Sequence, residues 1–295
     1  MIRRRFLQTT TLGLAAPLAR AIEPLNRPGK PRLLTTLAAY SFRGTFESEP
    51  SRLDMFKFVD YCADQGLAGA EVTSYYFPKD ADDGYFLRLK HHAFLRGVAL
   101  SGTAVGNNFA LPKGAARDKE IANVKQWIDR AALMGAPHIR VFAGAPPKDT
   151  PPDVAMTNCI EALDECAALA AQKGIFLGVE NHGGIVAEPE ALLHIIKTVK
   201  NSWLGINLDT GNFHTADPYA SLALCAPYAV NVQVKVEITP KGGRKQESDL
   251  TRLGKILRDT NYQGFVALEY EASEDAWTAV PRHLAALKQM CGATD

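Results

Sequence analysis

Short runs of apolar residues alternate along the chain with longer stretches in which apolar positions recur at helical spacing. This alternation is typical of successive βα units whose strands form a parallel sheet. We expect strands at eight ranges: 33–40, 69–73, 98–105, 138–142, 175–180, 203–209, 229–235 and 265–270. We expect helices at 51–66, 83–96, 116–134, 153–173, 188–200, 217–226, 248–259 and 276–290.

Eight strand–helix pairs without a polar linker predict one closed (β/α)8 barrel of the TIM-barrel type, an α/β fold. The chain has 295 residues, and such barrels typically need about 250. An open, doubly wound sheet is the alternative, but it favours a glycine-rich phosphate-binding turn after the first strand. Residues 40–44, with the sequence YSFRG, lack that spacing. We therefore expect residues 22–295 to form a single domain.

Residues at the ends of the predicted helices support these boundaries. Ser51 and Ser248 precede two of the helices and belong to the residue types that cap helix N-termini. Glycines stand before five predicted strands, where each would close the preceding helix. These glycines are Gly66, Gly97, Gly135, Gly174 and Gly264.

The first 21 residues have the features of an export signal. Arg3, Arg4 and Arg5 precede Phe6-Leu7-Gln8, which is similar to the twin-arginine pattern, and a short apolar stretch follows. Residues 19–21, with the sequence ARA, match a signal-peptidase site. The apolar stretch is too short to span a membrane. We expect export through the twin-arginine route to the periplasm or beyond, with no membrane insertion after the signal is removed.

Charge and cysteine content exclude some classes of protein. The formal net charge is +1, and residues 1–21 contribute four arginines and no acid. The remainder is therefore slightly acidic, which argues against a nucleic-acid partner. The five cysteines have no C-x-x-C spacing, so we expect buried thiols rather than a disulfide framework. The sequence leaves open whether the chain forms a homo-oligomer.

Acidic and amide residues stand at the carboxyl ends of the last four predicted strands, at 180–182, 207–212, 233–235 and 269–271. Active sites of (β/α)8 barrels lie at these strand ends. Three carboxylates, Glu180, Asp209 and Glu269, would meet there and repel one another unless a cation neutralised them. Oxygen ligands suit Mg²⁺ or Mn²⁺. The sequence therefore predicts a divalent-metal site.

The motifs VENH (179–182), LDTGN (208–212) and LEYE (268–271) carry a family resemblance. Over most of its length the chain resembles the xylose-isomerase-like sugar isomerase/epimerase family, which includes keto-sugar 3-epimerases and inosose dehydratases. The resemblance implies a metal held by Glu180, Asp209, position 233 and Glu269.

The family's usual His-x-Lys is here Gln233-Val234-Lys235. A glutamine carbonyl can still coordinate a metal, and the resulting all-oxygen site favours Mn²⁺ or Mg²⁺ over Co²⁺ or Zn²⁺. Glu271 points to the same side of its strand as Glu269 and is an alternative ligand.

Other residues near the strand ends are candidates for binding substrate. The resemblance implies that Lys235 meets a substrate oxygen and that Glu71 lines the pocket. His182 shares the side-chain direction of Glu180 and is suited to a sugar hydroxyl, while Asn212 and His214 are candidates at the rim. The alternative for Lys235 is a side chain that extends into solvent, and the alternative for Glu71 is a salt bridge in the barrel wall.

Such a site suits proton transfer next to a carbonyl, with Glu180 and Glu269 as catalytic residues and the metal stabilising an enediolate. Epimerisation, isomerisation and elimination all remain open. Export favours a small non-phosphorylated sugar, because sugar phosphates are mostly intracellular. We expect a metal-dependent sugar isomerase or epimerase. A 3-keto-glycoside lyase or inosose-type dehydratase is the main alternative, and a sugar-binding barrel without turnover is the non-enzymatic one.

Overall fold

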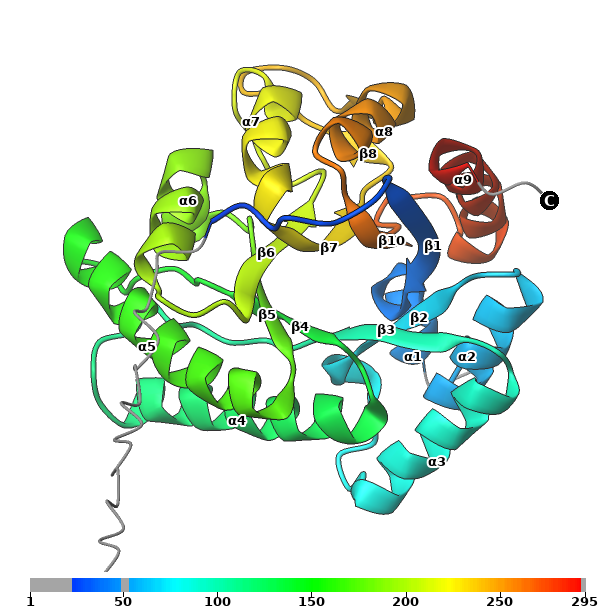
Figure 1. Cartoon of the computed structure of the whole chain (residues 1–295), viewed down its shortest axis with the longest axis horizontal. Coiled ribbons are helices and arrows are strands. Elements are labelled where there is room, and N and C mark those ends of the chain that lie inside the picture. The colour runs from blue at the N-terminus through cyan, green and yellow to red at the C-terminus, as the bar shows by residue number, and fades with distance from the viewer. Residues whose placement is uncertain (1–22, 49–52, 293–295) are drawn as a thin grey trace, which may run out of the picture.

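The computed structural model describes residues 23–48 and 53–292, in which eight parallel strands close into a barrel surrounded by helices (Figure 1). The strands follow one another around the barrel in the order β1-β10-β7-β6-β5-β4-β3-β2. Their bounds are β1 (Arg32–Ala38), β2 (Gly69–Thr73), β3 (Ala99–Ala104), β4 (His138–Phe142), β5 (Phe176–Glu180), β6 (Leu204–Asp209), β7 (Ala229–Val234) and β10 (Gln263–Leu268). The predicted (β/α)8 barrel is confirmed.

A helix follows each barrel strand, and the expected helices are all present within a few residues of their predicted ends. Their bounds are α2 (Met55–Asp64), α3 (Asp83–Leu95), α4 (Ala115–Met134), α5 (Pro152–Lys173), α6 (Pro189–Thr198), α7 (Pro218–Cys225), α8 (Leu250–Asp259) and α9 (Ala276–Cys291). Shorter helical turns are α1 (Arg43–Phe46), η1 (Ala39–Phe42), η2 (Ser74–Tyr76), η3 (Gly184–Val186) and η4 (Ala226–Tyr228). The pattern of the sequence did not predict the small antiparallel pair β8 (Glu237–Ile238) and β9 (Gln246–Glu247), which follows β7.

Some of the predicted helix ends are wrong. Ser51 lies outside the described residues, and Asp54 caps α2 by accepting a hydrogen bond from the backbone nitrogen of Lys57. Helix α8 is capped by Asp249 rather than by Ser248, whose hydroxyl bonds elsewhere.

Gly264 lies inside β10, and the left-handed turn after α8 falls on Asn261, with φ of 52°. Asparagine is one of the few residues that tolerate this conformation. The other four glycines do take the expected positive φ after their helices.

Strand alternation separates an apolar shell from a polar barrel interior. In β6, Asn207 and Asp209 alternate with the core residues Ile206 and Leu208, and all four are fully buried. Successive strand residues point to opposite faces, so one set packs against the helices while the other faces the barrel axis. The same alternation continues in β7. Polar groups therefore gather at the centre of the barrel.

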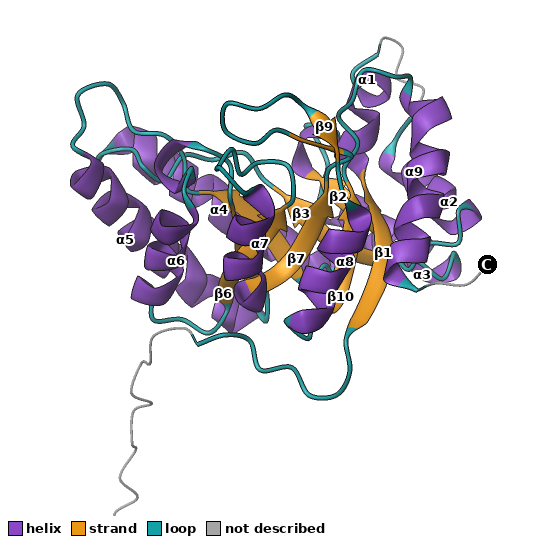
Figure 2. Cartoon of the chain, turned by 90° about the horizontal axis from the view of Figure 1, so that it is seen from above, coloured by secondary structure: helices purple, strands orange, loops and turns teal. Residues whose placement is uncertain are grey.

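The segment 23–31 runs along the end of the barrel opposite to β9 (Figure 2). The backbone nitrogen of Leu25 donates to Pro227, and the Arg27 guanidinium donates to the carbonyl of Ala229 and lies 4.8 Å from the centre of the Tyr262 ring. These contacts anchor the segment to the amino ends of β7 and β10. The other end, where the carboxyl ends of the strands meet, holds the predicted site.

None of the helices in the described ranges is long and apolar enough to cross a bilayer. All five cysteines lie within these ranges as free thiols, four of them buried, as expected.

Candidate active site

One ammonium group lies among three carboxylates at the carboxyl ends of β6, β7 and β10. The Nζ atom of Lys235 is 2.8 Å from Oε2 of Glu269, 3.4 Å from Oδ2 of Asp209 and 2.5 Å from Oε2 of Glu271. Lys235 and Glu269 are almost completely buried, Asp209 is completely buried, and the Glu271 side chain is 38% exposed. The structure thus brings together Asp209, Glu269 and Lys235 of the predicted site, together with Glu271, the alternative ligand.

The predicted catalytic residue Glu180, at the end of β5, has a separate set of partners. Its Oε2 lies 2.8 Å from Nε of the buried Arg140, and its Oε1 lies 2.8 Å from Nδ1 of His182. The side-chain amide of Asn212 also donates to Oε1, at 2.9 Å. Burial alone would raise the pKa of Glu180, but Arg140 and then His182 outweigh it and lower this pKa below its ordinary value. Glu180 is therefore a stable carboxylate.

Asp209 and Lys235 influence each other's protonation. Burial raises the pKa of Asp209, and although Lys235 opposes this, the nearby charges of Glu180 and Glu269 leave that pKa well above its ordinary value. Burial tends to lower the pKa of Lys235, but Asp209, Glu269 and Glu271 together raise it well above the usual range. The lysine is thus a permanent cation in an environment rich in acids.

The backbone around Lys235 is fixed by its neighbours. Its nitrogen donates to the Thr210 hydroxyl at 2.9 Å, and its carbonyl accepts from the Ser248 hydroxyl at 2.7 Å. The side chain runs over Gly211, where an added Cβ would lie 2.6 Å from Cγ of Lys235. Only a residue without a side chain leaves this space free. The lysine is therefore positioned by the loop that follows β6.

Two of the predicted site residues, Glu71 and Gln233, lie in a different part of the barrel interior. The amide nitrogen of Gln233 donates to Oε1 of Glu71, while its amide oxygen accepts from Asn207. Asn231 donates to the other oxygen of Glu71 at 2.7 Å, and Nε2 of His138 lies 4.0 Å away from it. Both ends of the Gln233 amide and both oxygens of Glu71 are thus used inside the barrel. Glu71 does not line the cavity at the strand ends.

Burial shifts the pKa values in this interior group. It raises the pKa of Glu71 to about 7, with a smaller contribution from the charge of Glu269 and opposing hydrogen bonds from Gln233 and Asn231. It lowers the pKa of His138 to about 4. His138 is therefore uncharged near neutral pH, and Glu71 keeps its proton until the pH approaches 7.

The residues at the strand ends do not fit the expected divalent ion. The carbonyl of Gln233, the fourth expected ligand, already accepts a hydrogen bond from Asn207. The ammonium of Lys235 bonds the Glu269 oxygen and lies against Asp209, where an ion would be held. Within residues 23–48 and 53–292, no three His, Cys, Asp or Glu side chains are grouped as a metal site.

A cavity of about 400 Å³ opens above Lys235. Its lining includes Tyr40, Asn212, His214, Lys235 and Glu271. The ring nitrogen Nδ1 of His214 lies 3.0 Å from the carbonyl of Thr239 at the rim. The volume is within the range of small-molecule sites. Two of its lining residues bind the buried carboxylates: Lys235 contacts Glu269, and Asn212 contacts Glu180.

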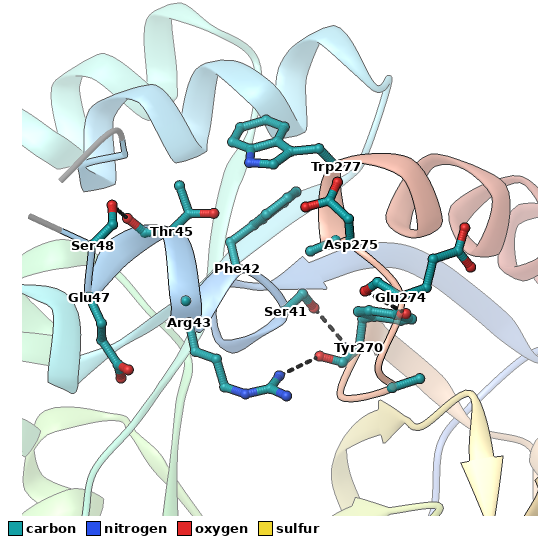
Figure 3. A pocket seen from close by; sticks show the side chains of 13 residues that line it. Ser41, Phe42, Arg43, Thr45, Glu47, Ser48, Tyr270, Glu274, Asp275 and Trp277 are labelled. Carbon is teal, nitrogen blue, oxygen red and sulfur yellow. Dashed lines mark hydrogen bonds between the residues drawn. The ribbon is translucent and has the colours of Figure 1, made fainter.

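A second cavity, of about 640 Å³, lies next to it between the loops after β1 and β10 (Figure 3). Ser41 donates to the carbonyl of Leu268 at 3.1 Å and Arg43 to that of Tyr270 at 3.0 Å, so the two loops are joined here. Arg43 lines both cavities. None of the predicted site residues lines the larger cavity, so we place the candidate site in the smaller one.

Sequence reasoning missed Arg140 and Tyr40. Arg140 stands in the middle of the buried strand β4, and an arginine in such a strand requires a buried acidic partner. That requirement was a usable signal. Tyr40 lies in η1, with its ring centre 5.8 Å from Nζ of Lys235, and nothing in its sequence context indicated this.

Several solved structures share this fold. D-psicose 3-epimerase in the presence of D-fructose matches over 88% of this chain and 100% of its own, with a TM-score of 0.73 and 15% identity. The 3-keto-D-glucoside 4-epimerase from E. coli matches over 88% and 100%, with a TM-score of 0.65 and 16% identity. The IolI protein with a bound zinc atom matches over 87% and 96%, with a TM-score of 0.70 and 16% identity. At this level of identity, the likeness shows a common fold.

A search of curated proteins found no match. The family model described as "Xylose isomerase-like TIM barrel" matches residues 59–289, which is most of the chain. The chain therefore belongs to the xylose isomerase-like TIM barrel family.

Proposed function

We propose that the protein is a sugar isomerase or epimerase that transfers a proton at the carbon next to the carbonyl of a non-phosphorylated keto-sugar. The observation that carries the proposal is the pair of buried carboxylates, Glu180 and Glu269, each held by its own cation beneath a cavity of sugar size. Membership of the xylose isomerase-like family supports a sugar as substrate. The proposed reaction needs no metal ion, because Gln233 and Lys235 do not fit one.

In this proposal the carboxylates move the proton and the lysine stabilises charge. One carboxylate removes the proton next to the carbonyl, and the carbonyl oxygen becomes negative. The ammonium of Lys235 stabilises this oxygen, and it does so strongly because the centre is largely shielded from water. Return of a proton to the opposite face of the same carbon gives an epimer. Return to the neighbouring carbon gives an isomer when the hydroxyl proton of the first carbon also passes to the former carbonyl oxygen, so that the carbonyl and the hydroxyl exchange places.

Incorporation of solvent deuterium into candidate sugars tests the proposal. Free ketoses and 3-keto-glycosides are incubated with the protein in D₂O, and NMR follows the proton next to the carbonyl. We expect exchange in at least one sugar and a loss of at least about 100-fold in Glu180→Gln. Glu165→Gln, which changes an exposed glutamate paired with Lys125 on α5, is the matched control. A lack of exchange across the whole panel would contradict the proposal and favour a barrel that only binds sugars.

Elimination is a second candidate reaction at the same centre. Tyr40 lines the cavity beside Lys235, and burial, followed by the charge of Glu271, raises its pKa. A tyrosine that keeps its proton can donate it to a leaving hydroxyl or aglycone. Formation of an unsaturated product by the wild type, and a much slower formation of that product by Tyr40→Phe, would assign the protein as a lyase or dehydratase.

We also propose that the protein is exported by the twin-arginine route. The supporting residues, 1–21, lie outside the described part of the structure. A fluorescent protein fused to the C-terminus should be found in the periplasm, and replacement of both Arg3 and Arg4 by lysine should retain it in the cytoplasm. A wild-type fusion that stays in the cytoplasm would contradict export.

A further inference from the structure

We infer that Lys235 supplies the cation of this centre from within the chain, and that the centre therefore binds no divalent metal ion. The inference deepens the proposed function, because the same ammonium would face the substrate oxygen. It rests first on the contacts of Nζ, which lies 2.5 to 3.4 Å from oxygens of three different carboxylates. These distances leave no room for a second cation between the ammonium and the oxygens.

The position of the lysine depends on several independent features of the loops. Thr210 and Ser248 bond its backbone from two sides, and Gly211 leaves the space through which its side chain passes. A lysine that simply extended into solvent would need none of these. Its side chain is only 9% exposed, so holding it there requires the compensating acids. The centre is therefore shaped around an ammonium group.

The donors left for a metal are too few. Gln233 is neutral, and its amide joins Asn207 to Glu71 in the barrel interior. Glu180 is held by Arg140 and His182. A divalent ion bound to Asp209 and Glu269 would have to displace the ammonium or lie within a few ångströms of it. Two cations at such a distance repel each other strongly at a buried site.

Glu271 provides the exchangeable contact. It is the most exposed of the three acids around Lys235 and also lines the cavity, while Asp209 and Glu269 are buried beneath it. A substrate oxygen entering the cavity would take the place of Glu271 on the ammonium. Asp209 and Glu269 would then continue to hold the lysine in place.

Titration calorimetry with MnCl₂, MgCl₂ and ZnCl₂ on the purified full chain tests the inference. After treatment with a chelator, the wild-type protein should show no binding of these ions at a stoichiometric site. Lys235→Met frees the oxygens of Asp209 and Glu269 and should bind one Mn²⁺. Its thermal midpoint should rise by roughly 5 °C at a Mn²⁺ concentration about 100 times the dissociation constant. Lys255→Met, which removes an exposed lysine paired with Asp259 on α8, should behave like the wild type.

One equivalent of ion bound tightly by the wild-type chain would overturn the inference. So would a folded Lys235→Met variant that fails to bind Mn²⁺, because another group would then be excluding the ion. If Lys235→Met does not fold, the wild-type measurement still decides.

The test is separate from that of the proposed function. A chain that binds no ion and shows no deuterium exchange would disprove the reaction and leave the role of Lys235 standing. A chain that exchanges deuterium only with a bound metal would support the reaction and disprove the role of Lys235.

Discussion

The barrel contains two groups of polar side chains, one in its interior and one at the carboxyl ends of its strands, and they are built on different principles. We call the interior group the lower layer, and it consists of Glu71, His138, Asn207, Asn231 and Gln233. We call the group at the strand ends the upper layer, and it consists of Arg140, Glu180, Asp209, Lys235 and Glu269. Strand β6 and the segment that begins with β7 each contribute to both layers. Asn207 precedes Asp209 by two positions, and Gln233 precedes Lys235 by two positions. Residues two apart on a strand point to the same side.

The layers differ in how their buried acids are compensated. Glu71 in the lower layer is surrounded by amides and has its pKa raised to about 7, so it can remain uncharged. Glu180 in the upper layer meets a guanidinium and has its pKa lowered. Neutral amides make a structural network, whereas carboxylates held by cations beneath a cavity can exchange protons with a ligand. The position of the cations therefore distinguishes the reactive layer.

Arg140→Met should produce the largest loss of stability. It leaves the buried carboxylate of Glu180 without its main cation, and breaking a buried ion pair in this way costs about 3–5 kcal/mol. Arg252→Met breaks an exposed pair with Asp217 and should cost at most about 1 kcal/mol. Denaturant unfolding of both variants measures the difference. Equal losses would mean that the upper layer does not depend on its cations.

Glu71→Gln should change the pH dependence of stability. The folded pKa of Glu71 is about 7, which is above its unfolded value. The contribution of Glu71 to the free energy of unfolding is therefore fully present below the unfolded pKa and is lost as the pH rises through 7. The folded pKa of His138 is about 4, below its unfolded value, so stability is lost as the pH falls from 6.5 towards 4. In the wild type these slopes oppose each other.

In Glu71→Gln only the His138 slope remains. The variant should lose up to about 3 kcal/mol more than the wild type between pH 7 and pH 4.5. Unfolding curves recorded across this range provide the test. Parallel curves for the two proteins would show that Glu71 is ionised throughout and that the lower layer resembles the upper one.

Gly211→Ala should have a smaller effect, confined to the upper layer. The new Cβ would lie 2.6 Å from Cγ of Lys235 and would push the lysine from its position, at a cost of about 1–3 kcal/mol. Gly44→Ala is the control, because a Cβ at Gly44 meets nothing within 4 Å. Thermal unfolding of the two variants gives the comparison. If Gly211→Ala is as stable as the control, the loop does not position Lys235.

The fold could be predicted from the sequence because its signals are local and repeat eight times. Apolar strands, glycine-ended helices and the carboxylates at strand ends each follow from a few neighbouring residues. The exact capping residues of α2 and α8 were not predicted, since Ser and Asp lie within three residues of each other at both helix starts and cap with nearly equal strength.

The partners of each site residue could not be predicted, because they come from distant strands. Arg140 and Glu180 are joined across the β4–β5 pair, and Gln233 meets Glu71 across the barrel. We expected Glu71, Gln233 and the carboxylates in one site because all of them stand at or near the ends of predicted strands. The sequence did not show which of these side chains would bond to one another inside the barrel. The division into two layers therefore appears only in the structure.

Solvent-deuterium exchange in two glutamate variants tests the division between the layers most directly. With a keto-sugar that the wild type labels, Glu269→Gln in the upper layer should lose at least about 100-fold in rate per folded molecule. Glu71→Gln in the lower layer should retain a rate within a few-fold of the wild type. Wild-type exchange in Glu269→Gln, or an equal loss in a folded Glu71→Gln protein, would contradict the account.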